Sequence, residues 1–331
     1  MELRRLGVLI AAVALASIGV GQITGKTTTI QSKPIKETTA QIMNRTRLYG
    51  PKLPIRVAKS LETEHEVERE GLRQNPRAMA SPTWPLQMGD RPNTSGIGKN
   101  PPPPPLFAVP VNFGGPTSSE SPYVPPDTDG DVSLSTVVVQ ANGRIRSYDR
   151  LGVPGALNTD ADSFFASVRT AIVVDPRVVF DRISQRWIIE GIDEGSPNNR
   201  ICFAVSNSEN ITAGTVWTFF QFSQNIGGGI DGFADYATMG VDANGVYFGT
   251  NRFGGSFSNC DLFAVNKASL LAGTLTVTAF HDIISAAKVG MFTPWPCSND
   301  DPTATVMFVM GVDINAFGQL DYRRITFSGG A

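Results

Sequence analysis

The sequence predicts an all-β protein whose ordered part, from Pro125 to the end, is built of β-propeller blades. Gly (33) and Pro (23) are frequent among the 331 residues, and Val, Phe and Thr stand in short runs between them. This composition is typical of short strands joined by tight turns. The second observation is an internal repeat, which favours a propeller over a sandwich or a barrel.

The repeat has a period of about 60 residues. Phe203-Ala-Val205 is followed by Ala-Gly-Thr215, and Phe263-Ala-Val265 is followed in the same way by Ala-Gly-Thr274. Each unit is predicted to hold four strands, at 177–181, 186–192, 200–206 and 215–222 and again at 237–242, 246–251, 261–266 and 275–280. Four antiparallel strands that recur in this way make a propeller blade.

Residues 1–21 have the form of a secretory signal peptide. Arg4 and Arg5 precede an apolar run from Leu6 to Val20, and small residues stand at its end. The run is shorter than the roughly 20 residues that span a bilayer, and an uncleaved anchor is the alternative. We therefore expect a secreted, extracellular or periplasmic protein with no membrane span in the mature chain.

Residues 22–124 are predicted to be a Pro-rich, largely disordered spacer with one helix at 55–73. Five consecutive prolines, Pro101 to Pro105, favour a stiff polyproline II rod. The region has too few apolar residues to form a core of its own. A proline-rich ligand for another protein is the alternative. The β-propeller-like domain is then expected to occupy 125–331.

The flanks of the repeat follow the same scheme. The Val139–Gly143 hairpin repeats the Val241–Gly245 hairpin, and a last partial unit holds 305–312 and 320–327. At about 60 residues each, the region from Pro125 holds about three to four blades, at the low end of the usual 4 to 8. The ring is therefore predicted to be incomplete, unless it closes with very few blades or its edges pair between chains.

Three cysteines are present, at 202, 260 and 297. In an oxidising compartment two of them can pair. Cys260 and Cys297 are the favoured disulfide because each is predicted at a strand edge or in a loop. Cys202 opens an apolar strand and is typical of a small buried hydrophobic residue.

Four segments resemble those of a family of large secreted bacterial propeller proteins with sialidase-like blades. They are Pro125–Asp131, Asp175–Arg182 with Trp187, Cys202–Ser206 with Gly214 and Trp217, and Asp235–Gly240 with Gly245–Tyr247. The resemblance extends over about 125–327 and implies blades and export, but the family has no established activity. Its members continue with further blades, so the resemblance also implies that this chain is truncated.

Asp127, Asp129 and Asp131 are candidate metal ligands. They are spaced by two in a Gly-containing segment, so alternate carboxylates are suited to one hard cation such as Ca²⁺. No Glu stands where a twelve-residue calcium loop has its bidentate ligand, and the alternative is a solvated turn. Asp160 and Asp162 form a weaker version of the same pattern. No other cofactor is expected.

The sequence has few candidates for catalysis. Gly-x-Ser-x-Gly, His-Glu-x-x-His and paired Cys-x-x-Cys motifs are missing, and neither His65 nor His281 stands beside a nucleophile motif. Five carboxylates near predicted strand ends are candidates for the acid and base pair of glycoside hydrolysis: Asp149, Asp175, Asp181, Asp235 and Asp242. Their recurrence at equivalent blade positions favours turn capping instead.

Three tryptophans, Trp187, Trp217 and Trp295, are candidates for stacking on sugars. Two of them lie in predicted strands, where packing in a core is the commoner role. The net charge indicates no particular partner, because 28 Lys and Arg nearly balance 30 Asp and Glu. No excess of basic residues favours binding to nucleic acid.

The leading hypothesis is an exported, non-enzymatic binding or surface-display module for a glycan or an extracellular protein. The first alternative is a sialidase-like or other carbohydrate-active hydrolase, which predicts carboxylates and arginines that converge on a central axis. The second alternative is a fragment of a larger propeller with no independent function.

Overall fold

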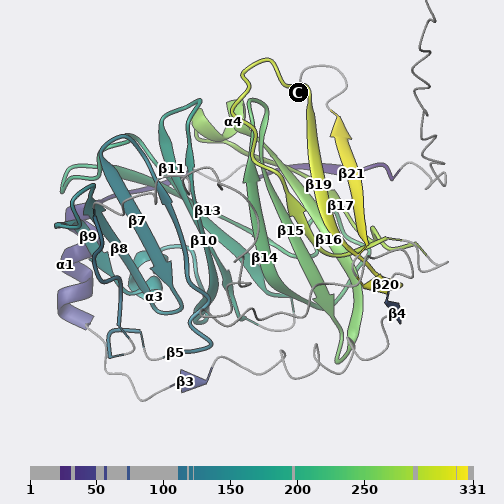
Figure 1. Cartoon of the computed structure of the whole chain (residues 1–331), viewed down its shortest axis with the longest axis horizontal. Coiled ribbons are helices and arrows are strands. Elements are labelled where there is room, and N and C mark those ends of the chain that lie inside the picture. Colours follow the sequence, from purple (N-terminus) through teal and green to yellow (C-terminus); the bar gives the residue numbers. More distant parts are fainter. Residues whose placement is uncertain are drawn as a thin grey trace, which may run out of the picture.

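Four antiparallel sheets follow one another along the chain (Figure 1). The computed structural model describes residues 23–30, 34–49, 56–57, 73–74, 111–117, 119–121, 123–195, 198–285, 290–317 and 319–326. The fold of these residues is mostly β, as the composition predicts, and none of the four sheets is closed on itself. The signal-like run, the five prolines and most of the predicted helix at 55–73 lie outside the described residues.

Each sheet is a meander in which strands pair in sequence order. The first sheet holds β6 (Asp129–Val132), β7 (Thr136–Ala141), β8 (Arg144–Asp149) and β9 (Pro154–Thr159). The second holds β10 (Val173–Asp181), β11 (Arg186–Asp193), β12 (Arg200–Ser206) and β13 (Val216–Ser223). The third holds β14 (Phe233–Val241), β15 (Gly245–Phe253), β16 (Phe257–Asn266) and β17 (Leu275–Phe280), and the fourth holds β18 (Met291–Pro296), β19 (Val306–Asp313) and β21 (Leu320–Thr326). The two predicted repeat units are thus the second and third sheets, strand by strand.

The first strands of the sheets lie side by side. β10 lies against β6 and β14, and β14 lies against β18. We call these four strands, β6, β10, β14 and β18, the inner strands.

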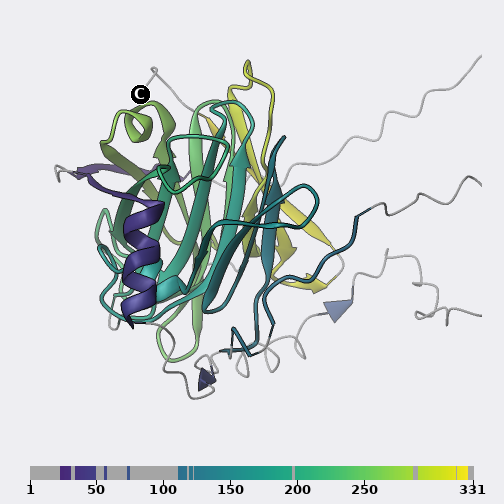
Figure 2. The ribbon, with the colours of Figure 1, turned by 90° about the vertical axis from the view of Figure 1, so that its left-hand side faces the viewer.

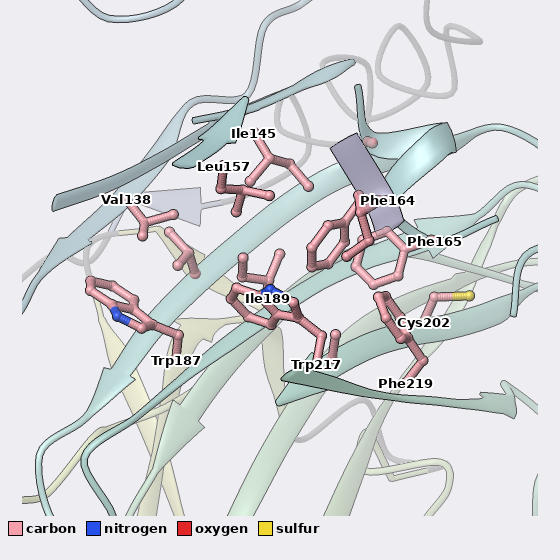
Figure 3. Packing of buried hydrophobic residues seen from close by; sticks show 14 of the residues in the cluster. Val138, Ile145, Leu157, Phe164, Phe165, Trp187, Ile189, Cys202, Trp217 and Phe219 are labelled. Carbon is pink, nitrogen blue, oxygen red and sulfur yellow. The ribbon is translucent and has the colours of Figure 1, made fainter. Parts of the chain in front are cut away.

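Successive side chains of a strand point to opposite faces of its sheet, so one sheet can pack against a neighbour on each face. In β11, Trp187 and Ile189 pack in a core shared with the first sheet, and Ile188 packs in a core shared with the third (Figure 3). A third core lies between the third and fourth sheets and includes Tyr247 and Met307. Three apolar layers therefore hold the four sheets together.

The N-terminal segment contributes to the fold, although the sequence assigns it to a spacer. β1 (Lys26–Ile30) pairs with β17 as a fifth strand of the third sheet, and β2 (Ile35–Thr38) pairs with β13 as a fifth strand of the second. Helix α1 (Thr39–Tyr49) then packs against β9 and the short helix α3 (Ala161–Phe164) (Figure 2). β1 and β2 are short and polar. They form strands because they pair with the edges of existing sheets, not because their own residues follow an apolar pattern.

Two short pairs link distant parts of the chain. β3 (Arg56–Val57) pairs with β5 (Tyr123–Val124), and β4 (Arg73–Gln74) pairs with β20 (Ala316–Phe317). The described ends of the predicted 55–73 helix are therefore extended. Helix α4 (Lys267–Leu271) lies between β16 and β17. Among the described residues, no helix is long and apolar enough to cross a membrane.

Candidate functional site at the inner strands

Backbone irregularities recur where the inner strands meet. β10, β14 and β18 each contain a register shift, between Val174 and Arg177, between Asp235 and Thr238, and between Phe292 and Trp295. A residue with positive φ lies in each: Asp175 (53°), Tyr236 (49°) and Thr293 (51°), while Asp127 (39°) precedes β6. Non-Gly residues in this conformation cost roughly 1–3 kcal/mol each and cluster at functional sites. Bulges also re-aim side chains.

Close backbone approach holds β18 in this place. A Cβ atom on Gly249 of β15 would lie 2.0 Å from the carbonyl oxygen of Pro294. The same oxygen accepts a hydrogen bond of 2.5 Å from the Thr238 hydroxyl. Glycine is therefore required at 249 for the bulge of β18 to sit against the third sheet.

Three carboxyl groups interact at this point: Asp127, which precedes β6, Asp175 in β10 and Asp235 in β14. Burial raises the pKa of Asp175 well above its usual range, and the charges of Asp235 and Asp127 raise it further. Burial also raises the pKa of Asp127, against hydrogen bonds with Asn142 and Asp175 that lower it. Asn142 joins the sheets here, because it donates to Asp127 (2.6 Å) and accepts from the amide of Asp175 (2.8 Å).

Arg177 stands among these carboxyls. Its guanidinium carbon lies 4.6 Å from the centre of the Tyr236 ring and 5.3 Å from that of the Trp295 ring. Nη1 donates to the carbonyl of Pro176, whereas Nε and Nη2 are buried and have no partner in the described part of the chain. Those two atoms form the edge of arginine that binds two acceptors side by side.

Glu190 lies opposite Arg177 in the pairing of β10 with β11. It is fully buried, and neither of its carboxylate oxygens has a partner within the described ranges. Burial raises its pKa well above the usual value, with the Arg177 charge acting in the opposite direction. We call Asp127, Asp175, Arg177, Glu190, Asp235, Tyr236 and Trp295 the inner-edge cluster.

Stability is expected to fall as the pH rises above the ordinary carboxyl range. A folded-state pKa that is raised means that the folded protein holds its proton where the unfolded chain releases it, so stability present below about pH 4.5 is lost at higher pH. Each carboxyl contributes about 1.4 kcal/mol per pH unit across its window. Glu190→Gln should therefore flatten the fall of the unfolding free energy as the pH rises above about 4.5, measured by urea denaturation at a series of pH values.

Glu209→Gln is the matched control. Burial raises the pKa of Glu209, but hydrogen bonds from Ser133 and Ser135 outweigh it and lower the pKa. Because its pKa is lowered rather than raised, this variant should keep the slope of the wild type above the ordinary carboxyl range. Equal slopes for wild type and Glu190→Gln would show that Glu190 is ionised in the folded protein.

The predicted calcium ligands do not gather around one point. Asp129 accepts from the amide of Val178 (2.9 Å) and Asp131 accepts from that of Phe180 (2.8 Å), so both carboxylates bind the edge of β10. Asp127 joins the inner-edge cluster instead. In the described part of the chain no three His, Cys, Asp or Glu side chains are grouped to hold a metal ion. The i, i+2 spacing places Asp129 and Asp131 on the same edge of β6, where both meet β10.

The weaker aspartate pair is also engaged by the backbone. Asp160 caps helix α3 through the amide of Ser163 (2.7 Å), and Asp162 accepts from the amide of Val173 (2.9 Å).

The five recurring aspartates divide into two groups. Asp149, Asp181 and Asp242 accept from backbone amides two to four residues further on, which is the turn capping that their recurrence predicts. Asp175 and Asp235 instead lie at bulges of the inner strands. The remaining cluster members Arg177, Glu190 and Tyr236 were not predicted. The signal for Glu190 is a lone charge inside the apolar run Trp187–Ile192.

The other candidates have structural roles. Trp187 and Trp217 are fully buried, and their indole N–H groups donate to the Glu209 carbonyl (2.7 Å) and the Thr39 hydroxyl (3.0 Å). His281 faces Asp261 with Nδ1 (3.2 Å) and the carbonyl of Ile226 with Nε2 (2.8 Å), so neither nitrogen is available as a base. His65 lies outside the described residues.

The cysteines do not form the expected disulfide. Cys202, Cys260 and Cys297 all carry thiols in the structure. Cys260 is buried in the core between the third and fourth sheets, where its Sγ lies 3.2 Å from Oδ1 of Asn251, whereas Cys297 follows β18 and is partly exposed.

Comparison with known proteins yields only a distant structural similarity. No protein-family model and no curated protein matches the chain. A crystal structure of a candidate exo-β-1,3-galactanase from Bifidobacterium bifidum S17 is distantly similar, with 10% sequence identity and a TM-score of 0.33. The likeness covers 56% of this chain and 61% of that protein.

Proposed function

We propose that this chain is an exported, non-enzymatic module that binds a glycan at the inner-edge cluster. The observation that carries the proposal is the position of Trp295, whose side chain is 43% exposed and lies over Arg177, next to buried carboxyl groups. An exposed indole beside fixed hydrogen-bonding groups is suited to a sugar, which presents an apolar ring face and hydroxyls. The basic and apolar N-terminal run supports export.

The scaffold of the proposal is an arc of propeller blades. Each sheet is a meander, and its first strand lies beside the first strand of the next sheet. This is the arrangement in which blades surround an axis. Loops and bulges at that axis come from different sheets, so a ligand there would contact several of them at once.

Uncharged hydroxyls suit the cluster better than anions do. Among the described residues, Arg177 is the cation that acts on the carboxyls of Asp127, Asp175 and Glu190. A hydroxyl both donates and accepts, so it can bond to Arg177 and to these carboxyls in either protonation state, whereas an anion could pair with Arg177 alone. We therefore expect neutral oligosaccharides to bind more tightly than acidic ones.

The test is a glycan array of neutral and acidic oligosaccharides, read with the labelled full chain. We expect binding of neutral glycans, and about a tenfold or greater loss for Trp295→Ala because stacking on an aromatic ring is lost. Phe308→Ala is the matched control, since Phe308 is an aromatic residue of similar exposure (48%) on the same sheet. Equal loss in both variants, or no bound glycan, would contradict the proposal.

A second candidate function at the same place is glycoside hydrolysis. The convergence of Asp127, Asp175 and Asp235 favours it, because Asp175 has a raised pKa beside a second carboxyl, as an acid and base pair requires. Release of reducing sugar from an array-selected glycan, abolished by Asp175→Asn with binding retained, would establish this function. Binding of the glycan without its hydrolysis would exclude this second function and support the non-enzymatic binding module.

A further inference from the structure

The fourth sheet ends in an open strand. It has three strands, whereas the first sheet has four and the second and third have five, each including a strand from the N-terminal segment. β21 pairs with β19 on one side, and in the described part of the chain no strand pairs with its other side (Figure 1). An unpaired edge of this kind is a template for another strand.

The outer face of the same sheet is apolar. Large hydrophobic side chains there are exposed on all three strands: Trp295, Phe308, Met310, Leu320 and Tyr322. Cross-strand pairing places Trp295, Met310 and Tyr322 in one row. The outer face of the first sheet differs, because residues of the preceding segment contact it; Phe113 packs on Tyr148, with ring centres 4.9 Å apart.

We propose that β21 pairs antiparallel with β21 of a second copy of this chain, about a two-fold axis at Tyr322. The hydrogen-bonding direction of the strand supports this register. The amide of Asp313 donates to the carbonyl of Gln319 (2.9 Å), so odd-numbered residues of β21 point their backbone groups at β19. Leu320, Tyr322 and Arg324 therefore direct theirs to the open edge.

The side chains favour the same register. With Tyr322 opposite Tyr322 of the second copy, Asp321 stands opposite Arg323 of the second copy, twice by symmetry. This is a non-hydrogen-bonded pair, in which side chains approach most closely. A two-fold axis at Arg323 would instead place like charges opposite each other.

Arg323 and Asp321 already form an ion pair within one chain, and both side chains remain partly exposed. Nη1 of Arg323 donates to Asp321 (2.7 Å) and to the carbonyl of Tyr322 (3.0 Å). Nε and Nη2 are buried and have no partner in the ranges that the structure describes. A second copy would therefore meet Arg323 through the accessible part of its side chain, which is 19% exposed, and Asp321 is 20% exposed.

The experiment is sedimentation of the full chain and two charge reversals. Wild type is expected to dimerise, and Asp321→Arg or Arg323→Asp alone should weaken the dimer about tenfold, because two attractive pairs become repulsive. An equimolar mixture of the two variants restores opposite charges across the axis, so it should form heterodimers as tight as the wild-type dimer. The double variant Asp321→Arg with Arg323→Asp should dimerise by itself.

Circular dichroism melts verify that each variant is folded. A wild type that stays monomeric at all accessible concentrations would overturn the proposal. A dimer that neither charge reversal weakens, or a mixture that fails to recover, would also overturn it, because the contact would then lie elsewhere.

Discussion

Lys267→Met is expected to lower the free energy of unfolding by about 3–5 kcal/mol. The Lys267 ammonium lies 2.9 Å from the Asp181 carboxylate, and both side chains are almost fully buried. Lys267 begins helix α4 of the third sheet, and Asp181 ends β10 of the second, so the pair joins two sheets. Removal of the cation leaves a buried carboxylate whose remaining partners are the Ser184 hydroxyl and the Ile183 amide.

Urea denaturation measures this loss of stability. Two further variants show whether it comes from the uncompensated buried charge. The double variant Lys267→Met with Asp181→Asn should recover most of the loss, because the uncompensated charge is then removed as well. Lys36→Met is the matched control, since Lys36 lies exposed on β2 and its change should stay within about 0.5 kcal/mol. If Lys267→Met and Lys36→Met had equally small effects on the unfolding free energy, the ion pair between Lys267 and Asp181 would not be formed in solution.

Trp187→Ala is expected to cost about 3–5 kcal/mol. The indole is fully buried between the first and second sheets, packs on Phe180 with ring centres 5.0 Å apart, and donates to the Glu209 carbonyl (Figure 3). The substitution leaves a cavity and an unpaired carbonyl. The midpoint and slope of a urea titration give the loss.

Two comparisons separate packing from the hydrogen bond at Trp187. Trp187→Phe keeps most of the volume and should lose roughly 1–2 kcal/mol, chiefly for the hydrogen bond. Trp295→Ala removes a partly exposed indole and should cost less than Trp187→Ala by at least about 2 kcal/mol. If Trp187→Ala proved as mild as Trp295→Ala, the first two sheets would not share the core described here.

The strands were predictable because their pattern is local. In the second and third sheets β-branched and aromatic residues recur with the same spacing, so each predicted strand appears within a few residues of its observed bounds. The N-terminal strands were not predictable in this way. Lys26–Ile30 and Ile35–Thr38 have no strong apolar alternation, and they are strands because β17 and β13 offer edges.

The candidate site was predictable only in part. Asp175 and Asp235 stand out in the sequence, but as members of a recurring set whose other members cap turns. Asp175 and Asp235 differ from the other members because each lies at a bulge of an inner strand. Such a bulge depends on contacts between sheets, which the local sequence does not reveal. The gathering of Arg177 with rings from β14 and β18 depends on the same contacts.

The most direct test of the proposed ligand site is a crystal structure of the chain with a neutral oligosaccharide selected on the array. We expect one sugar ring to stack on Trp295 and its hydroxyls to bond to carboxyls of the inner-edge cluster. A sugar bound away from the inner strands, with Trp295 uncovered, would contradict the assignment of this cluster as the ligand site.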